Sequence, residues 1–98
     1  MERINVSAVS PYAESFGFSR AVRAGDHVFV AGCAAIGPDG ENVGVGDPAA
    51  QARRCFEVIE GALREAGASM QEVVMTRVYL VDPAHGDAVA EVHGEVFG

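Results

Sequence analysis

The chain holds two cysteines, the side chains best suited to nucleophilic chemistry, and they lie in different contexts. Cys33 follows Gly32 and the short apolar stretch 27–31, a predicted strand end of the kind where enzymes often hold reactive groups. Cys55 falls on the apolar stripe of a predicted helix, where a free cysteine packs as a small apolar residue. A histidine could serve Cys33 as base only through a tertiary contact. Cys33 is thus either a nucleophile or a small residue in a tight place.

The remaining reactive side chains are not spaced as metal or cofactor ligands. His27, His85 and His93 are scattered and stand at no ligand spacing from a cysteine, so no metal site is predicted. The chain has no lysine, which excludes Schiff-base chemistry on a side chain and pyridoxal phosphate held that way. Residues 44–49 match G-x-G-x-x-A, but Asp47 places a carboxylate where a phosphate would sit. We therefore expect no cofactor.

Composition narrows the class of protein. A chain of 98 residues with 49% hydrophobic content predicts one compact domain, near the size at which chains often oligomerise. The net charge of −7, from 14 acidic and 7 basic residues, disfavours binding to a nucleic acid. No apolar run reaches about 18 residues and the N-terminus lacks a signal-peptide pattern. We expect a cytoplasmic protein with reduced thiols and no membrane partner.

The elements that would position these residues begin with a hairpin. Residues 18–23 alternate in polarity, residues 27–31 are β-branched and aromatic, and Ala24-Gly25-Asp26 between them supplies the turn. A weaker strand is predicted over 3–6, and a polar loop over 10–15 separates it from the hairpin. This arrangement would bring Cys33 to the end of the second hairpin strand.

Two helices are predicted, each beginning at an Asp-Pro pair. In the first, Asp47 can cap the free amides, Pro48 suits the first helical position and Gly67 suits the end. Its apolar stripe consists of Ala52, Cys55, Phe56, Ile59, Ala62, Leu63 and Ala66. The second helix follows Asp82-Pro83, and its stripe consists of Val89, Val92, His93, Val96 and Phe97. On such a stripe a histidine is more often packed and hydrogen-bonded than a ligand.

Residues 73–81 predict a strand that is covered on both faces. One side carries Val74, Val78 and Leu80, and the other Val73, Met75, Tyr79 and Val81. Ser69-x-x-Glu72 is a capping box that predicts one helical turn before this strand. The two helices can cover one face of the sheet. A chain this short has little left to cover the other face, which other copies of the chain would cover. The order strand, hairpin, helix, strand, helix predicts an α+β fold with both helices on one face.

Three segments together resemble the YjgF/RidA superfamily, also labelled L-PSP endoribonuclease-like. They are GFSRAVRAGDHVFVAG, GDPAAQARRCFEVIEGALREAGASMQEVVMTRVYLVD and VHGEVFG, and the similarity runs from Arg3 to Gly98. The R-A-G-D hairpin, the G-C strand end, the D-P-x-x-Q helix start and the V-Y-L-V-D strand occur in the family's order. The resemblance implies a chorismate-mutase-like mixed sheet, in a single domain over 1–98 that lacks the family's C-terminal strands. It also implies a homotrimer with pockets between its subunits.

The resemblance implies alternative functions. Deaminase members hydrolyse reactive 2-imino or enamine acids to keto acids and ammonia without a cofactor, using a carboxylate-binding arginine, backbone donors and a positioned water. Members without that arginine would instead bind a small metabolite in the same cleft without turnover. The endoribonuclease label is a third interpretation, and the acidic charge and the lack of paired catalytic histidines argue against it.

The candidate pocket residues are Phe18, Ser19, Gly32 and Cys33. Phe18 stands where deaminase members have an aromatic hydroxyl, and Cys33 where they often have glutamine. Gly32 would present backbone groups to the ligand. The family's arginine and water-positioning acid lie in strands beyond Gly98, so no catalytic residue is assigned here. Because the implied chemistry uses water and not a thiolate, we expect Cys33 to line the pocket.

Overall fold

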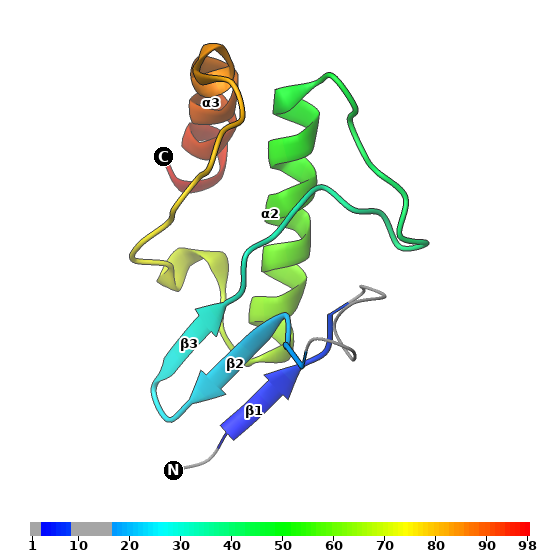
Figure 1. The fold of residues 1–98 in the computed structure, drawn as a ribbon. Coiled ribbons are helices and arrows are strands. Elements are labelled where there is room, and N and C mark those ends of the chain that lie inside the picture. Colours follow the sequence, from blue (N-terminus) through cyan, green and yellow to red (C-terminus); the bar gives the residue numbers. More distant parts are fainter. Residues whose placement is uncertain (1–2, 9–16) are drawn as a thin grey trace.

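The computed structural model describes residues 3–8 and 17–98, which form an α+β fold (Figure 1). Its sheet has the order β1-β2-β3, with β1 at Arg3–Val6, β2 at Ala21–Ala24 and β3 at His27–Val30. The helices are α2 (Pro48–Glu65) and α3 (Gly86–Phe97), and the short 3-10 helices are η1 (Met70–Glu72) and η2 (Pro83–His85). The predicted fold class is confirmed. The predicted loop over 10–15 lies outside the described residues.

β2 and β3 form the predicted hairpin. Their antiparallel pairs are Ala21–Val30, Val22–Phe29, Arg23–Val28 and Ala24–His27. This register leaves Gly25 and Asp26 as a two-residue turn, and Gly25 has a φ of 62°, which glycine adopts without steric penalty. The pairing continues past the strands, because the Ala31 amide donates to the Arg20 carbonyl at 2.9 Å. The hairpin thereby holds the start of one strand beside the end of the other.

Small side chains bring α2 close to the sheet. Ala62 of α2 and Ala66, which follows the helix as its C-cap, lie in one buried cluster with Val6 and Ala21 of the strands. Arg23 Nη1 donates to the Ala66 carbonyl at 2.8 Å and ties β2 to the end of the helix. Of the predicted stripe, Ala52, Ala62, Leu63 and Ala66 are buried as expected, whereas Cys55, Phe56 and Ile59 are half-buried.

Both ends of α2 follow the sequence signals. Asp47 Oδ1 accepts a hydrogen bond from the Ala50 amide at 3.1 Å, so a carboxylate of the protein itself occupies the helix N-terminus. At the other end Gly67, with φ of 81°, allows the amides of Gly67 and Ala68 to donate back to the carbonyls of Arg64 and Leu63. Residues 44–49 are therefore a glycine loop that leads into a capped helix.

α3 packs beside α2, away from the three strands (Figure 1). Val92 is fully buried, and His93 lies beside two aromatic rings that also contact each other, with centroid distances of 6.0 Å to Phe56 and 4.7 Å to Phe97. His93 Nε2 also shares a hydrogen bond of 2.9 Å with Thr76 Oγ1. These contacts confirm a packed, hydrogen-bonded histidine. No helix in the described ranges is long and apolar enough to cross a bilayer.

The predicted strand over 73–81 is not formed. The segment runs from η1 towards α3 and pairs with no strand among the described residues, so the sheet is antiparallel throughout and not mixed. Alternation along a sequence shows which faces of a segment are apolar, whereas a strand also needs a neighbouring edge to complete its hydrogen bonds. The η1 turn before it is as predicted, with the Ser69 amide donating to Glu72 Oε1 at 3.0 Å.

Candidate functional site

The four predicted pocket residues lie on two neighbouring segments. Phe18 and Ser19 lead into β2, and Gly32 and Cys33 leave β3. Because β2 and β3 are antiparallel, both pairs lie at the same end of the hairpin. Phe18 and Gly32 are exposed, whereas Ser19 and Cys33 are half-buried.

Arg20 links the two segments. Its Nη1 donates to the Gly32 carbonyl at 2.5 Å, with a longer contact of 3.4 Å to the Ala31 carbonyl. Its guanidinium carbon also lies 5.9 Å from the centroid of the Phe18 ring, a cation–π arrangement. Sequence reasoning missed Arg20 as a site residue. Its only signal in the sequence was its place directly after Phe18 and Ser19, in the segment that leads into β2.

Gly32 and Cys33 also offer backbone donors. Within residues 3–8 and 17–98, the amide groups of Gly32 and Cys33 donate to no protein acceptor. Two adjacent free amides beside the positive charge of Arg20 are suited to a carboxylate or to an oxygen that gains negative charge. The strand end thus carries two backbone amides that are free to donate, and their use by a ligand stays a prediction.

The Cys33 side chain lies against α2. Cys55 Sγ is 3.5 Å from the Cys33 carbonyl oxygen, and Cys33 Sγ is 3.9 Å from the Cys55 carbonyl oxygen. Sequence analysis assigned Cys55 to core packing, but it is half-buried and faces the candidate site. The contact joins residues far apart in the sequence, so no local spacing could have shown it.

The two thiols differ in acidity because they interact with each other. A hydrogen bond from Cys55 lowers the pKa of Cys33 to about 7 against the opposing effect of burial, and the charges of Arg20 and Arg54 lower it further. The pKa of Cys55 is raised, first because its proton is held by Cys33 and next because of burial. Arg54 is fixed in place, with Nε donating to the Ile36 carbonyl at 2.7 Å. Cys33 is accordingly the thiol that ionises near neutral pH.

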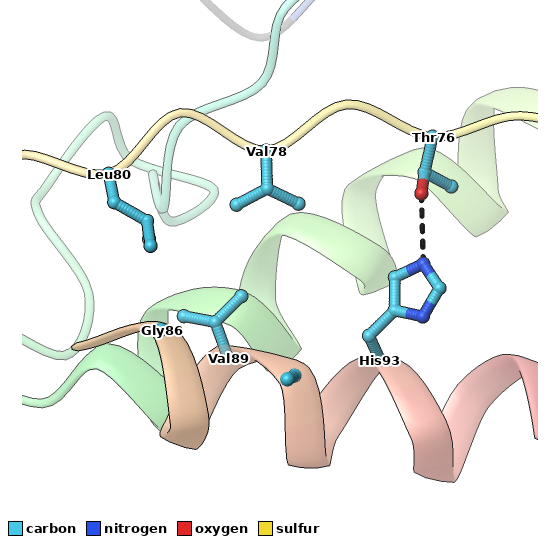
Figure 2. A pocket seen from close by; sticks show the side chains of 7 residues that line it. Thr76, Val78, Leu80, Gly86, Val89 and His93 are labelled. Carbon is cyan, nitrogen blue, oxygen red and sulfur yellow. Dashed lines mark hydrogen bonds between the residues drawn. The ribbon is translucent and has the colours of Figure 1, made fainter. Parts of the chain in front are cut away.

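Two hollows in the described surface lie away from these residues. The hollow in Figure 2 has a volume of about 320 Å³ and lies between the 76–80 segment and α3. Val78, Leu80 and Val89 line it with apolar groups, and the Thr76–His93 hydrogen bond crosses it at one end. The second hollow, of about 260 Å³, lies over α2 and α3 beside the ion pair between Arg53 and Glu95. Neither hollow includes a predicted pocket residue.

Metal ligands do not cluster in the described ranges, where no three His, Cys, Asp or Glu side chains gather. The polar groups available at the hairpin end are instead the two free amides, the Arg20 guanidinium and the two thiols. This set can bind an anion and can supply a nucleophilic sulfur.

Sequence comparison relates nearly the whole chain to known proteins. The family described as "Endoribonuclease L-PSP" matches residues 8–98. An uncharacterized protein of Streptomyces coelicolor is 44% identical over 92 residues, which cover 94% of this chain and 68% of that protein. A RutC family protein of Pyrococcus abyssi is 40% identical over 81 residues, which cover 83% of this chain and 64% of that protein. The 3-aminoacrylate deaminase RutC of Acinetobacter baylyi is 35% identical over 77 residues, covering 79% and 61%. The chain thus spans about two thirds of the length of these relatives.

Solved structures share the fold. A member of the YjgF/YER057c/UK114 family from Mycobacterium tuberculosis superimposes with a TM-score of 0.86 at 41% identity, covering 99% of this chain and 75% of that one. A protein from Thermotoga maritima has a TM-score of 0.83 at 29% identity, covering 100% and 76%.

Proposed function

The chain belongs to the endoribonuclease L-PSP family, also called YjgF/RidA, and we propose that it hydrolyses reactive 2-imino or enamine acids. An enamine first takes up a proton on carbon and becomes an imine; water then adds to the carbon of the C=N bond, the C–N bond breaks, and an oxo acid (a 2-keto acid from a 2-imino acid) and ammonia leave. The reaction needs no cofactor, because water is the nucleophile and the nitrogen departs as ammonia after it takes up protons.

The similarity to 3-aminoacrylate deaminase carries this proposal. The aligned 77 residues include most of the described fold at 35% identity. 3-Aminoacrylate is an enamine acid whose carboxylate lies one carbon away from the carbon bonded to nitrogen, so a related substrate would offer a carboxylate near a C–N bond. The free amides of Gly32 and Cys33, beside Arg20, supply donors for such a carboxylate.

A cleft between subunits would complete the site. In the described part of one chain, Phe18, Ser19, Gly32 and Cys33 lie at one end of the hairpin and line neither of the two hollows, so on this proposal they form only one wall of the site. Large apolar side chains of the 73–81 segment are exposed, among them Val74, Met75, Tyr79 and Val81. Burial of this surface between copies would be favourable. We propose a homotrimer whose second subunit supplies the opposite wall.

A binding protein without turnover is the second candidate. Phe18 favours it, because its ring stacks on Arg20 and brings no hydroxyl to the site. Such a protein would hold a small metabolite through the same amides and release it unchanged. The endoribonuclease activity in the family's description is opposed by the net charge of −7, which would repel an RNA backbone.

A coupled imine assay tests the proposal. An amino-acid oxidase generates the imine, semicarbazide traps it, and the full chain should lower semicarbazone yield by converting the imine first. Unchanged trapping at all protein concentrations would refute the deaminase. Substrate-analogue binding in the same preparation would then support the non-catalytic alternative, and loss of a single-stranded RNA probe would support the endoribonuclease.

A further inference from the structure

We propose that Cys33 and Cys55 form a dithiol site that reacts with hydroperoxides and closes to an intramolecular disulfide. The site joins the segment after β3 to the middle of α2. Its chemistry uses the protein's own sulfur atoms, so the proposal does not rest on the deaminase activity.

The contacts between the two residues make this bond feasible. Each sulfur lies within 4.0 Å of the other residue's carbonyl oxygen, at 3.5 Å for Cys55 Sγ and 3.9 Å for Cys33 Sγ. A disulfide needs its two side chains to point towards one another across a short backbone separation. Each thiol reaches the other residue's backbone and the two thiols are close enough to share a hydrogen bond, which meets the first condition. Both residues are half-buried and free, so small oxidants can reach them.

The surroundings assign different roles to the two sulfurs. Arg20 is held at the Gly32 carbonyl and Arg54 at the Ile36 carbonyl, so two fixed positive charges favour a thiolate at either sulfur, and the interaction between the two thiols decides which one carries it. The Cys55 proton stabilises a thiolate at Cys33, and this interaction keeps Cys55 protonated. Cys33 is therefore the attacking sulfur, and Cys55 is the sulfur that resolves the product.

The first step oxidises Cys33. Its thiolate attacks the outer oxygen of the hydroperoxide, an S–O bond forms, and the O–O bond breaks. The departing hydroxide or alkoxide takes up a proton and leaves as water or an alcohol. Cys33 becomes a sulfenic acid, and the peroxide has accepted two electrons.

The second step forms the disulfide. The sulfenic acid is neutral, so it neither holds the Cys55 proton nor repels a negative charge on Cys55. Of the causes that raise the pKa of Cys55, only burial then remains. The Cys55 sulfur attacks the Cys33 sulfur, the S–O bond breaks, and the leaving hydroxide combines with the Cys55 proton as water. The product is a Cys33–Cys55 disulfide.

Mass spectrometry of the full chain tests this assignment. Reduced protein treated with hydrogen peroxide should lose two hydrogen atoms, and digestion without reductant should yield one linked peptide pair that contains Cys33 and Cys55. In Cys55→Ser the reaction should stop at Cys33, where dimedone would label the sulfenic acid. In the unsubstituted reduced chain, iodoacetamide at pH 7 should alkylate Cys33 at least about tenfold faster than Cys55.

Three results would overturn the proposal. They are disulfides only between separate chains, equal alkylation rates of Cys33 and Cys55 in the unsubstituted chain, and dimedone labelling of Cys55 instead of Cys33 in the unsubstituted chain treated with peroxide. Circular dichroism of the reduced serine variant shows whether it retains the fold. If that variant unfolds, intact-mass and peptide analysis of the unsubstituted chain still decides the outcome, because an absent Cys33–Cys55 link refutes the site.

Discussion

The thiols of Cys33 and Cys55 lie reciprocally against each other's backbone, with Cys55 Sγ 3.5 Å from the Cys33 carbonyl and Cys33 Sγ 3.9 Å from the Cys55 carbonyl. Cys33 belongs to the candidate site at the hairpin end, whereas Cys55 belongs to α2. The arrangement therefore makes the ionisation of a site residue depend on a helix that packs on the sheet. It also means that the chemistry of Cys33 reports on the packing of that helix.

The rate of Cys33 alkylation should rise with pH along a titration curve whose midpoint lies near pH 7. The pKa is below the ordinary value of 9.0, so the reactive thiolate is present from a lower pH and is lost as the pH falls through about 7. Cys55→Ala removes the hydrogen bond that contributes most, and should move the midpoint upward. Iodoacetamide labelling at Cys33, quantified by peptide mass spectrometry across pH, measures both. A Cys33 midpoint that stays the same in Cys55→Ala would contradict the coupling.

Arg20→Met should loosen the hairpin end. The substitution keeps an apolar stem but removes the hydrogen bond to Gly32 and the stacking on Phe18. We expect a loss of about 1 kcal/mol in the free energy of unfolding and at least a roughly tenfold loss of imine hydrolysis. The pKa of Cys33 should also rise, because Arg20 lowers it. That rise is measurable by alkylation and separates a positioning role from a purely structural one.

The matched control is Arg64→Met. Arg64 is exposed on α2 and forms an i,i+4 ion pair with Glu60 at 3.3 Å, a contact that contributes little to stability. Its loss should leave both imine hydrolysis and Cys33 alkylation unchanged. Equal effects of the two substitutions would remove Arg20 from the site.

Asp47→Ala should destabilise the helix that carries Cys55. The carboxylate accepts a hydrogen bond from the Ala50 amide at 3.1 Å, and loss of such a cap typically costs about 1 kcal/mol. Urea denaturation followed by circular dichroism measures the change. Asp39→Ala is the control, because the Asp39 side chain is exposed in the turn at 38–40 and forms no hydrogen bond with the described residues. Equal losses in both variants would show that the cap contributes nothing.

Features with a local cause could be predicted from the sequence. The hairpin turn follows from Gly25-Asp26, and both ends of α2 follow from Asp47 and Gly67. The buried face of α2 follows from apolar side chains that recur every three or four residues. Phe18, Ser19, Gly32 and Cys33 share one end of the hairpin because an antiparallel turn requires it. Each of these causes acts over a few residues, so the sequence alone contains it.

Features that depend on distant partners could not be predicted. The Cys33–Cys55 contact and the Arg20–Gly32 hydrogen bond each join separate segments, and no spacing encodes such approaches. The 73–81 segment failed as a strand for the same reason, since its apolar alternation contains no information on the neighbouring edge. Assignment of Cys55 to core packing likewise considered only its own helix.

The exposed side of the 73–81 segment should be buried between copies of the chain. Thr76, Val78 and Leu80 line the hollow against α3 (Figure 2), whereas Tyr79 is 87% exposed. Light scattering of the unsubstituted chain should give the mass of three copies. Tyr79→Glu should reduce that mass, because a charge would be forced into an apolar interface without a partner. Val45→Glu, at a loop position that is 82% exposed, is the matched control and should leave the assembly intact. A monomer mass for the unsubstituted chain would reject the trimer.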